Sequence, residues 1–135
     1  MVTQIDHIEL IVNDVQQYID LFTMLGFKIV TQTDHHGGSV ELQLPGPNQP
    51  VFEIHKTLIE EVPGVNHIAF RVTDVNETYE QFKNAGLRID KEPGYSPHTG
   101  RTNMNARDPD GWRLQICDAK RIDPEGEEAK AKLQK

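Results

Sequence analysis

The sequence predicts an α+β fold made of two copies of a β-α-β-β-β module, and three observations support this. The first is an internal repeat: residues 5–29 and 65–89 share 8 of 25 positions without a gap, where unrelated stretches would share about one or two. The second is that each copy opens with a strand-like apolar segment and continues with apolar residues at helical spacing. The third is that Gly-, Pro- and Asn-rich turns separate three further strand-like segments in each copy.

In the first copy, residues 5–12 are rich in Ile, Leu and Val and are predicted to form a buried strand. Asp14 is a suitable N-cap for the following helix, and Gly26 supplies the positive φ with which helices often end. Two turns, at residues 34–38 and 45–48, then separate the remaining segments. These segments predict three more strands, at 27–33, 39–44 and 51–56.

The second copy repeats this plan after a short connector at residues 57–63. Asp74 caps its helix and Gly86 ends it. The predicted strands are 65–72, 87–91, 101–107 and 112–117, with a polar loop at 93–100 and a tight turn at 108–111. We therefore expect a single domain over residues 1–119, with module one at 4–56 and module two at 64–118, followed by a charged C-terminal tail at 120–135.

The composition excludes several classes of function. The chain has 135 residues and a formal net charge of −7, with no cluster of Lys and Arg, so nucleic acid and anionic membranes are unsuitable partners. Cys117 is the only cysteine, which rules out an internal disulfide. Neither a signal peptide nor a long apolar segment is present. We expect a cytoplasmic protein.

The most informative residues are four polar side chains on the predicted strands. His7 and His67 occupy equivalent positions of the repeat, and Glu53 and Gln115 are equivalent at an offset of 62 residues. Strand parity places all four on the sheet face turned away from the helices. A single strand histidine is more often structural than a ligand, but two N and two O donors related by a pseudo-twofold suit a divalent ion such as Ni, Zn, Co, Mn or Fe(II).

The other candidate residues have weaker interpretations. His55 lies on the same face as Glu53 and is expected either to support the site or merely to line the sheet. The remaining candidates are His35 and His36, expected to be solvated in a turn, His98, expected in an exposed loop, and Cys117, expected to be a small buried residue.

These residues resemble the vicinal oxygen chelate superfamily, which contains glyoxalase I, bleomycin resistance proteins, methylmalonyl-CoA epimerase and extradiol dioxygenases. The most specific match is Arg107-Asp108-Pro109-Asp110-Gly111-Trp112-Arg113-Leu114-Gln115-Ile116, which is similar to the family's characteristic turn and last strand. The resemblance covers about residues 4–118. It implies an incomplete eight-stranded barrel, a homodimer, a small-molecule substrate, and a divalent metal ion held by His7, Glu53, His67 and Gln115.

The resemblance further implies a glyoxalase I-like lyase or isomerase, which acts through a metal-stabilised enediolate with Glu53 as the catalytic base. Gln115 departs from the family pattern, because the last strand generally supplies a Glu. An epimerase with a base on each face is therefore disfavoured, as is an Fe(II) ring-cleaving dioxygenase. A non-catalytic small-molecule or antibiotic-binding protein of the bleomycin-resistance type is the alternative from a different class, with Trp112 and Tyr95 as stacking groups.

Overall fold

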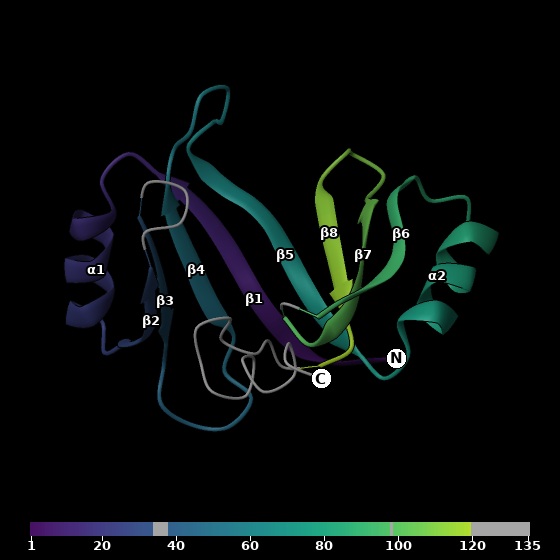
Figure 1. The fold of residues 1–135 in the computed structure, drawn as a ribbon, viewed down its shortest axis with the longest axis horizontal. Coiled ribbons are helices and arrows are strands. Elements are labelled where there is room, and N and C mark those ends of the chain that lie inside the picture. Colours follow the sequence, from purple (N-terminus) through teal and green to yellow (C-terminus); the bar gives the residue numbers. More distant parts are fainter. Residues whose placement is uncertain (34–37, 98, 120–135) are drawn as a thin grey trace. The chain divides into compact units, whose positions relative to one another are not determined.

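The computed structural model describes residues 1–33, 38–97 and 99–119 and has eight strands and two helices (Figure 1). In chain order these are β1 (Val2–Val12), α1 (Val15–Met24), β2 (Lys28–Thr33), β3 (Ser39–Gln43), β4 (Val51–Lys56), β5 (Gly64–Val72), α2 (Val75–Asn84), β6 (Ile89–Ser96), β7 (Arg101–Arg107) and β8 (Arg113–Cys117). The predicted α+β class and the repeated β-α-β-β-β order are confirmed. Among the described residues, no helix is both long and apolar enough to span a membrane.

The chain divides into two compact units. We call Ile5–Ile68 the first unit, and Met1–Gln4 with the described residues from Ala69 onward the second unit. The hydrogen-bonded strand order is β2-β3-β4-β1-β5 in the first unit and β5-β8-β7-β6 in the second, because β5 contributes residues to both. The sheet is not closed: β2 and β6 are its edge strands.

In the first unit, α1 covers one face of the sheet. Its N-cap is Asp14, whose side chain accepts hydrogen bonds from two backbone N–H groups of the first turn. Leu25 is the C-cap of the helix, and Gly26 follows with φ of 101°, a backbone conformation that glycine adopts without strain. The buried core beneath the helix consists of Val12, Ile19, Val40, Leu42 and Ile54, with Leu10, Phe22, Phe27 and Phe52 packed around it.

The second unit has a matching core under α2, formed by Val72, Val75, Met104, Ala106 and Ile116. The predicted turn between β7 and β8 is present. Asp108 Oδ1 accepts hydrogen bonds from the backbone N–H groups of Asp110 and Trp112, at 3.0 and 2.7 Å. These bonds fix the start of β8 and therefore the direction in which its alternate side chains point.

The predicted end of β6 in the second unit is wrong. Residues 93–96 are not part of a polar loop, since β6 runs on to Ser96 and pairs with β7. The ladder shifts register twice, between Ile89 and Lys91 and between Lys91 and Gly94. Such bulges, on an edge strand, accommodate Pro93, whose nitrogen cannot donate to a neighbouring strand.

Candidate metal centre

Strands β1 and β4 place polar side chains on the sheet face opposite α1. Leu10 and Ile54 belong to the core beneath the helix, so the alternate residues of the same strands face the other way. These alternate residues are His7 and Glu9 on β1, and Glu53 and His55 on β4, with Glu9 and Glu53 directly paired in register. The parity assigned from the sequence is therefore confirmed for the first unit.

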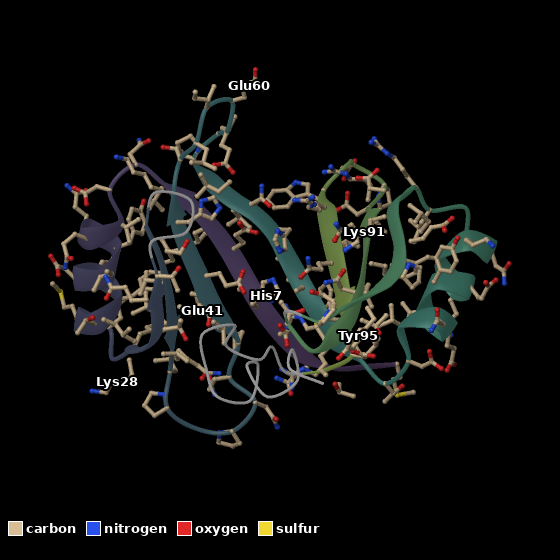
Figure 2. The ribbon with its side chains drawn as sticks, in the orientation of Figure 1. His7, Lys28, Glu41, Glu60, Lys91 and Tyr95 are labelled. Atoms are coloured by element: carbon tan, nitrogen blue, oxygen red, sulfur yellow. The ribbon has the colours of Figure 1, made fainter. Side chains whose placement is uncertain are left out.

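The two repeated histidines come together in the first unit. His7 on β1 is 2% exposed and His67 on β5 is 5% exposed. Their Nε2 atoms are 3.1 Å apart, and the ring planes meet edge to face at 78°. Figure 2 labels His7 on β1. The sequence repeat thus predicted correctly that these two residues meet.

The Nδ1 atoms of both rings are held by oxygen atoms. His7 Nδ1 lies 2.7 Å from Asp6 Oδ2, and His67 Nδ1 lies 2.8 Å from Asn66 Oδ1 and 2.8 Å from Glu9 Oε2. Ionised carboxylates can only accept hydrogen bonds, so each Nδ1 carries the hydrogen. Sequence reasoning missed Asp6 and Asn66, although an Asx residue precedes the histidine in both copies of the repeat.

This arrangement leaves a lone pair on each Nε2, because a neutral imidazole has one donor and one acceptor nitrogen. Two lone pairs that face one another at 3.1 Å in a buried setting repel unless a cation or a proton lies between them. Two imidazole ligands at ordinary metal–nitrogen distances are about 2.9–3.4 Å apart. The pair therefore fits a divalent metal ion in spacing, orientation and tautomer.

Glu53 lies at the margin of this pair. Its Oε2 atom is 3.7 Å from His7 Nε2, and its side chain is mostly buried. Within residues 1–33, 38–97 and 99–119, no group of three or more His, Cys, Asp or Glu side chains is already gathered as a complete metal cage. The two imidazoles are at the spacing of metal ligands, but the Glu53 oxygen is a few tenths of an ångström too far away. A small rotation of the Glu53 side chain would bring this oxygen into place.

A row of acidic residues crosses the same face. Glu9 on β1, Glu53 on β4 and Glu41 on β3 are in register across three neighbouring strands, and Figure 2 labels Glu41 on β3. Like charges at directly opposed positions destabilise a sheet. Glu9 offsets part of this repulsion through its contacts with His67 and His55.

His55 connects to the site through Glu9. Its Nε2 is 2.7 Å from Glu9 Oε1, and its Nδ1 is 3.0 Å from the Lys56 carbonyl oxygen. Because both ring nitrogens face oxygen acceptors, these contacts favour the cationic ring with a hydrogen on each nitrogen. Burial alone would lower the pKa of His55, but the Lys56 carbonyl and the Glu9 and Glu61 carboxylates outweigh it and raise the pKa.

Glu9 is the corresponding anion. Burial would raise the pKa of its carboxyl group, but its contacts with His67 and His55 outweigh burial and lower the pKa from 4.5 to about 2. The carboxylate is therefore ionised at neutral pH, as its role as an acceptor for two imidazoles requires. The geometry of His55 therefore favours the interpretation that this residue supports the site over the interpretation that it merely lines the sheet.

The fourth predicted ligand, Gln115, belongs to the second unit. It lies on β8, opposite Asn105 of β7, and its Nε2 donates a 3.5 Å hydrogen bond to Asn105 Oδ1. Its role as a ligand stays a prediction. Cys117 on the same strand is fully buried, as expected. His35, His36, His98 and the tail at 120–135 lie outside the described residues.

Residues 4–116 match the Glyoxalase/Bleomycin resistance protein/Dioxygenase superfamily. Among solved structures, methylmalonyl-CoA epimerase from Streptomyces coelicolor, in complex with 2-nitronate-propionyl-CoA, is 18% identical with a TM-score of 0.67, over 88% of this chain and 99% of that one. The Mycobacterium tuberculosis methylmalonyl-CoA epimerase is 20% identical with a TM-score of 0.69, over 87% and 88%. A superfamily member from Vibrio splendidus is 20% identical with a TM-score of 0.62, over 84% and 97%. Comparison with curated sequences gave no match.

Proposed function

We propose, from the premise that the chain belongs to the Glyoxalase/Bleomycin resistance protein/Dioxygenase superfamily, that it is a divalent-metal-dependent isomerase or lyase of the glyoxalase I-like type. Its substrate would be a small molecule that offers two neighbouring oxygens to the ion. The observation that carries this proposal is the buried His7–His67 pair, whose Nε2 atoms face each other at 3.1 Å with both Nδ1 atoms held by oxygens. His7, His67, Glu53 and Gln115 would hold the ion.

A divalent ion in this position supplies Lewis acidity, which stabilises negative charge that develops on a carbonyl oxygen of the substrate. The two histidines bind as neutral ligands and Gln115 adds a neutral oxygen, so Glu53 is the one carboxylate in the proposed set. A donor set with a single negative charge leaves the ion more electrophilic than a set with two.

Glu53 would remove the proton next to the carbonyl group and return it to the neighbouring carbon. It is the one ionisable oxygen donor of the proposed ligand set, and its side chain keeps some access to solvent. Gln115 cannot accept a proton, so removal and return on one face of the substrate fit this chain better than a base on each face. The epimerase neighbours support proton abstraction next to a carbonyl as the reaction class, while Gln115 argues against two-base epimerisation.

Metal analysis tests the first half of this proposal. Protein purified without chelator is expected to carry about one divalent ion per chain, measured by mass spectrometry, and the double variant His7→Ala with His67→Ala is expected to lose it. Circular dichroism would confirm that the variant folds. Unchanged metal content in a folded double variant would refute the proposal, as would wild-type protein that holds no stoichiometric ion.

Deuterium exchange tests the second half. In D2O, the metal-loaded enzyme is expected to introduce deuterium next to the carbonyl group of a 2-oxo substrate, which NMR detects. Glu53→Gln retains an oxygen ligand but removes the base, so exchange should stop while most of the metal remains bound. Exchange that continues in Glu53→Gln would exclude Glu53 as the base.

A binding protein of the bleomycin-resistance type is the second candidate. It is favoured by two large aromatic side chains of the second unit, Tyr95 and Trp112, which are both exposed and suited to stacking on a planar ligand. Saturable binding of such a ligand by metal-free protein, without turnover, would support it. Oxygen consumption with catechols would instead indicate a ring-cleaving dioxygenase.

A further inference from the structure

Glu9 is not one of the proposed metal ligands, yet its carboxylate makes two close contacts with histidine rings. Its Oε2 atom lies 2.8 Å from His67 Nδ1, and its Oε1 atom lies 2.7 Å from His55 Nε2. All three side chains belong to the first unit, and Glu9 is largely buried between the two rings. A carboxylate with both oxygens engaged cannot rotate without breaking one of the two hydrogen bonds.

We propose that Glu9 is a positioning residue of the metal site, which holds the ring of His67 with Nδ1 protonated and Nε2 directed at the ion, while His55 holds Glu9 in place. This inference rests on the proposed function. Its physical basis is general: a metal-bound histidine needs an acceptor on its second nitrogen, which fixes the tautomer, orients the ring and makes the ligand nitrogen more basic.

A comparison of the two copies explains why Glu9 is needed. Asp6 precedes His7 and gives it a carboxylate partner at 2.7 Å, but the equivalent residue before His67 is Asn66, whose amide oxygen is neutral. An ionised acceptor binds a donor about twice as strongly as a neutral one. Glu9 supplies the missing charge from β1, so the Nδ1 atom of each histidine has one carboxylate partner.

The position equivalent to Glu9 in the second copy is Ala69, which is fully buried. The second copy therefore has no carboxylate at either position, and both acids of the paired histidines come from β1. His55 makes the arrangement rigid, because the Lys56 carbonyl oxygen holds its other nitrogen at 3.0 Å. The His55 ring, held by the backbone of β4, thus positions the Glu9 carboxylate, and Glu9 in turn positions the ring of His67.

The test is a titration of the metal-free protein with Co²⁺ alone, in wild type and in Glu9→Gln. The variant is expected to bind Co²⁺ about 10- to 100-fold more weakly. Glu60→Gln is the matched control, because it removes the same charge at the exposed tip of the connector, away from β1 (Figure 2). The Co²⁺ affinity of Glu60→Gln should equal that of wild type. If Glu9→Gln also bound Co²⁺ as tightly as wild type, the inference would be overturned.

A rescue variant separates positioning from a general structural role. Adding Asn66→Asp to Glu9→Gln gives His67 the same preceding acid that His7 has, so most of the lost Co²⁺ affinity should return. Failure of the folded double variant to regain affinity would contradict the positioning role. Wild-type protein that binds no Co²⁺ would refute the proposed function itself, whereas normal wild-type binding with an unaffected Glu9→Gln would refute only the role of Glu9.

One further measurement needs no variant. Nitrogen-15 NMR of the histidine rings in metal-free wild type reports which ring nitrogen carries the hydrogen. His67 is expected in the form with Nδ1 protonated and Nε2 bare. A ring protonated at Nε2 instead would overturn the inference even if Glu9→Gln failed to fold.

Discussion

Residues 5–68 and the residues from 69 onward follow the same β-α-β-β-β plan, but their charges differ. The first stretch has two cationic side chains, Lys28 and Lys56, against nine Asp and Glu, whereas residues 69–118 have seven against eight. All six arginines of the chain lie at position 71 or later. The duplication has therefore kept the fold in both halves, while the formal net negative charge is concentrated in one of them.

The difference is sharpest at equivalent positions around the histidines. Three acids of the first copy, Asp6, Glu9 and Glu53, correspond to Asn66, Ala69 and Gln115 in the second. His7 and His67 are unchanged. The histidines are thus shared between the copies, whereas the acids that contact the rings, including the proposed base Glu53, come from one copy alone. We infer that the first unit determines the chemistry at the ion.

The largest expected effect is on the free energy of unfolding, and it concerns the hydrophobic core that each unit has. Leu42 and Met104 are both 0% exposed, one in each core. Leu42→Ala and Met104→Ala should each lower the free energy of unfolding by about 2–5 kcal/mol, because each leaves a cavity, as measured by chemical denaturation. Ile59→Ala, at a side chain that is 94% exposed, should change it by less than about 0.5 kcal/mol. If one of the two core substitutions changed the free energy of unfolding as little as Ile59→Ala does, the two cores would not be equivalent.

A smaller effect is expected from making the copies alike in charge. Gln115→Glu restores the second carboxylate and should tighten metal binding by about tenfold, since affinity rises with the charge of the ligand set. Asn105→Asp is the control, because it adds the same charge on the neighbouring strand, opposite Gln115. Calorimetric titration would show equal tightening in both variants if Gln115 were not a ligand.

The smallest effect concerns how the second unit neutralises its acids. Arg107 donates a hydrogen bond to Asp90, and with Arg88 it holds the pKa of Asp90 below its usual 3.8. A depressed pKa stabilises the fold above the unfolded value and loses that contribution as the pH falls through the folded value.

Asp90→Asn should therefore lower the melting temperature slightly at pH 7, with the difference disappearing in acid below the ordinary Asp range. Asp110→Asn, in the exposed turn, is the control and should show no such pH-dependent difference. A difference for Asp90→Asn that persists unchanged at low pH would mean that the ion pair is not its source.

Much of the fold could be predicted from the sequence because its periodicity is regular. The bounds of β4 and β7 match the predicted segments, and the Asp14 and Asp74 caps start the two helices as expected. The repeat also predicted that His7 and His67 would meet. The extension of β6 could not be predicted, because Pro93 and Gly94 are typical of loops and the bulges that admit them depend on pairing with β7.

The oxygen partners of the histidine rings were harder to anticipate. Strand parity assigns Asp6 and Asn66 to the face opposite their histidines, yet both side chains bend to reach the adjacent Nδ1. Parity placed Glu9 on the correct face but gave no partner for it. Contacts of this kind depend on rotamers and on cross-strand distances, which a pattern of apolar and polar residues does not encode.

The central claim is that His7 and His67 hold one divalent ion between their Nε2 atoms. The most direct test is a crystal structure of Co²⁺-loaded protein with diffraction data collected at the cobalt absorption edge. The account predicts one anomalous peak per chain, about 2.0–2.2 Å from both Nε2 atoms. Full Co²⁺ loading with the peak elsewhere, or with a hydrogen bond directly between the two rings, would contradict it.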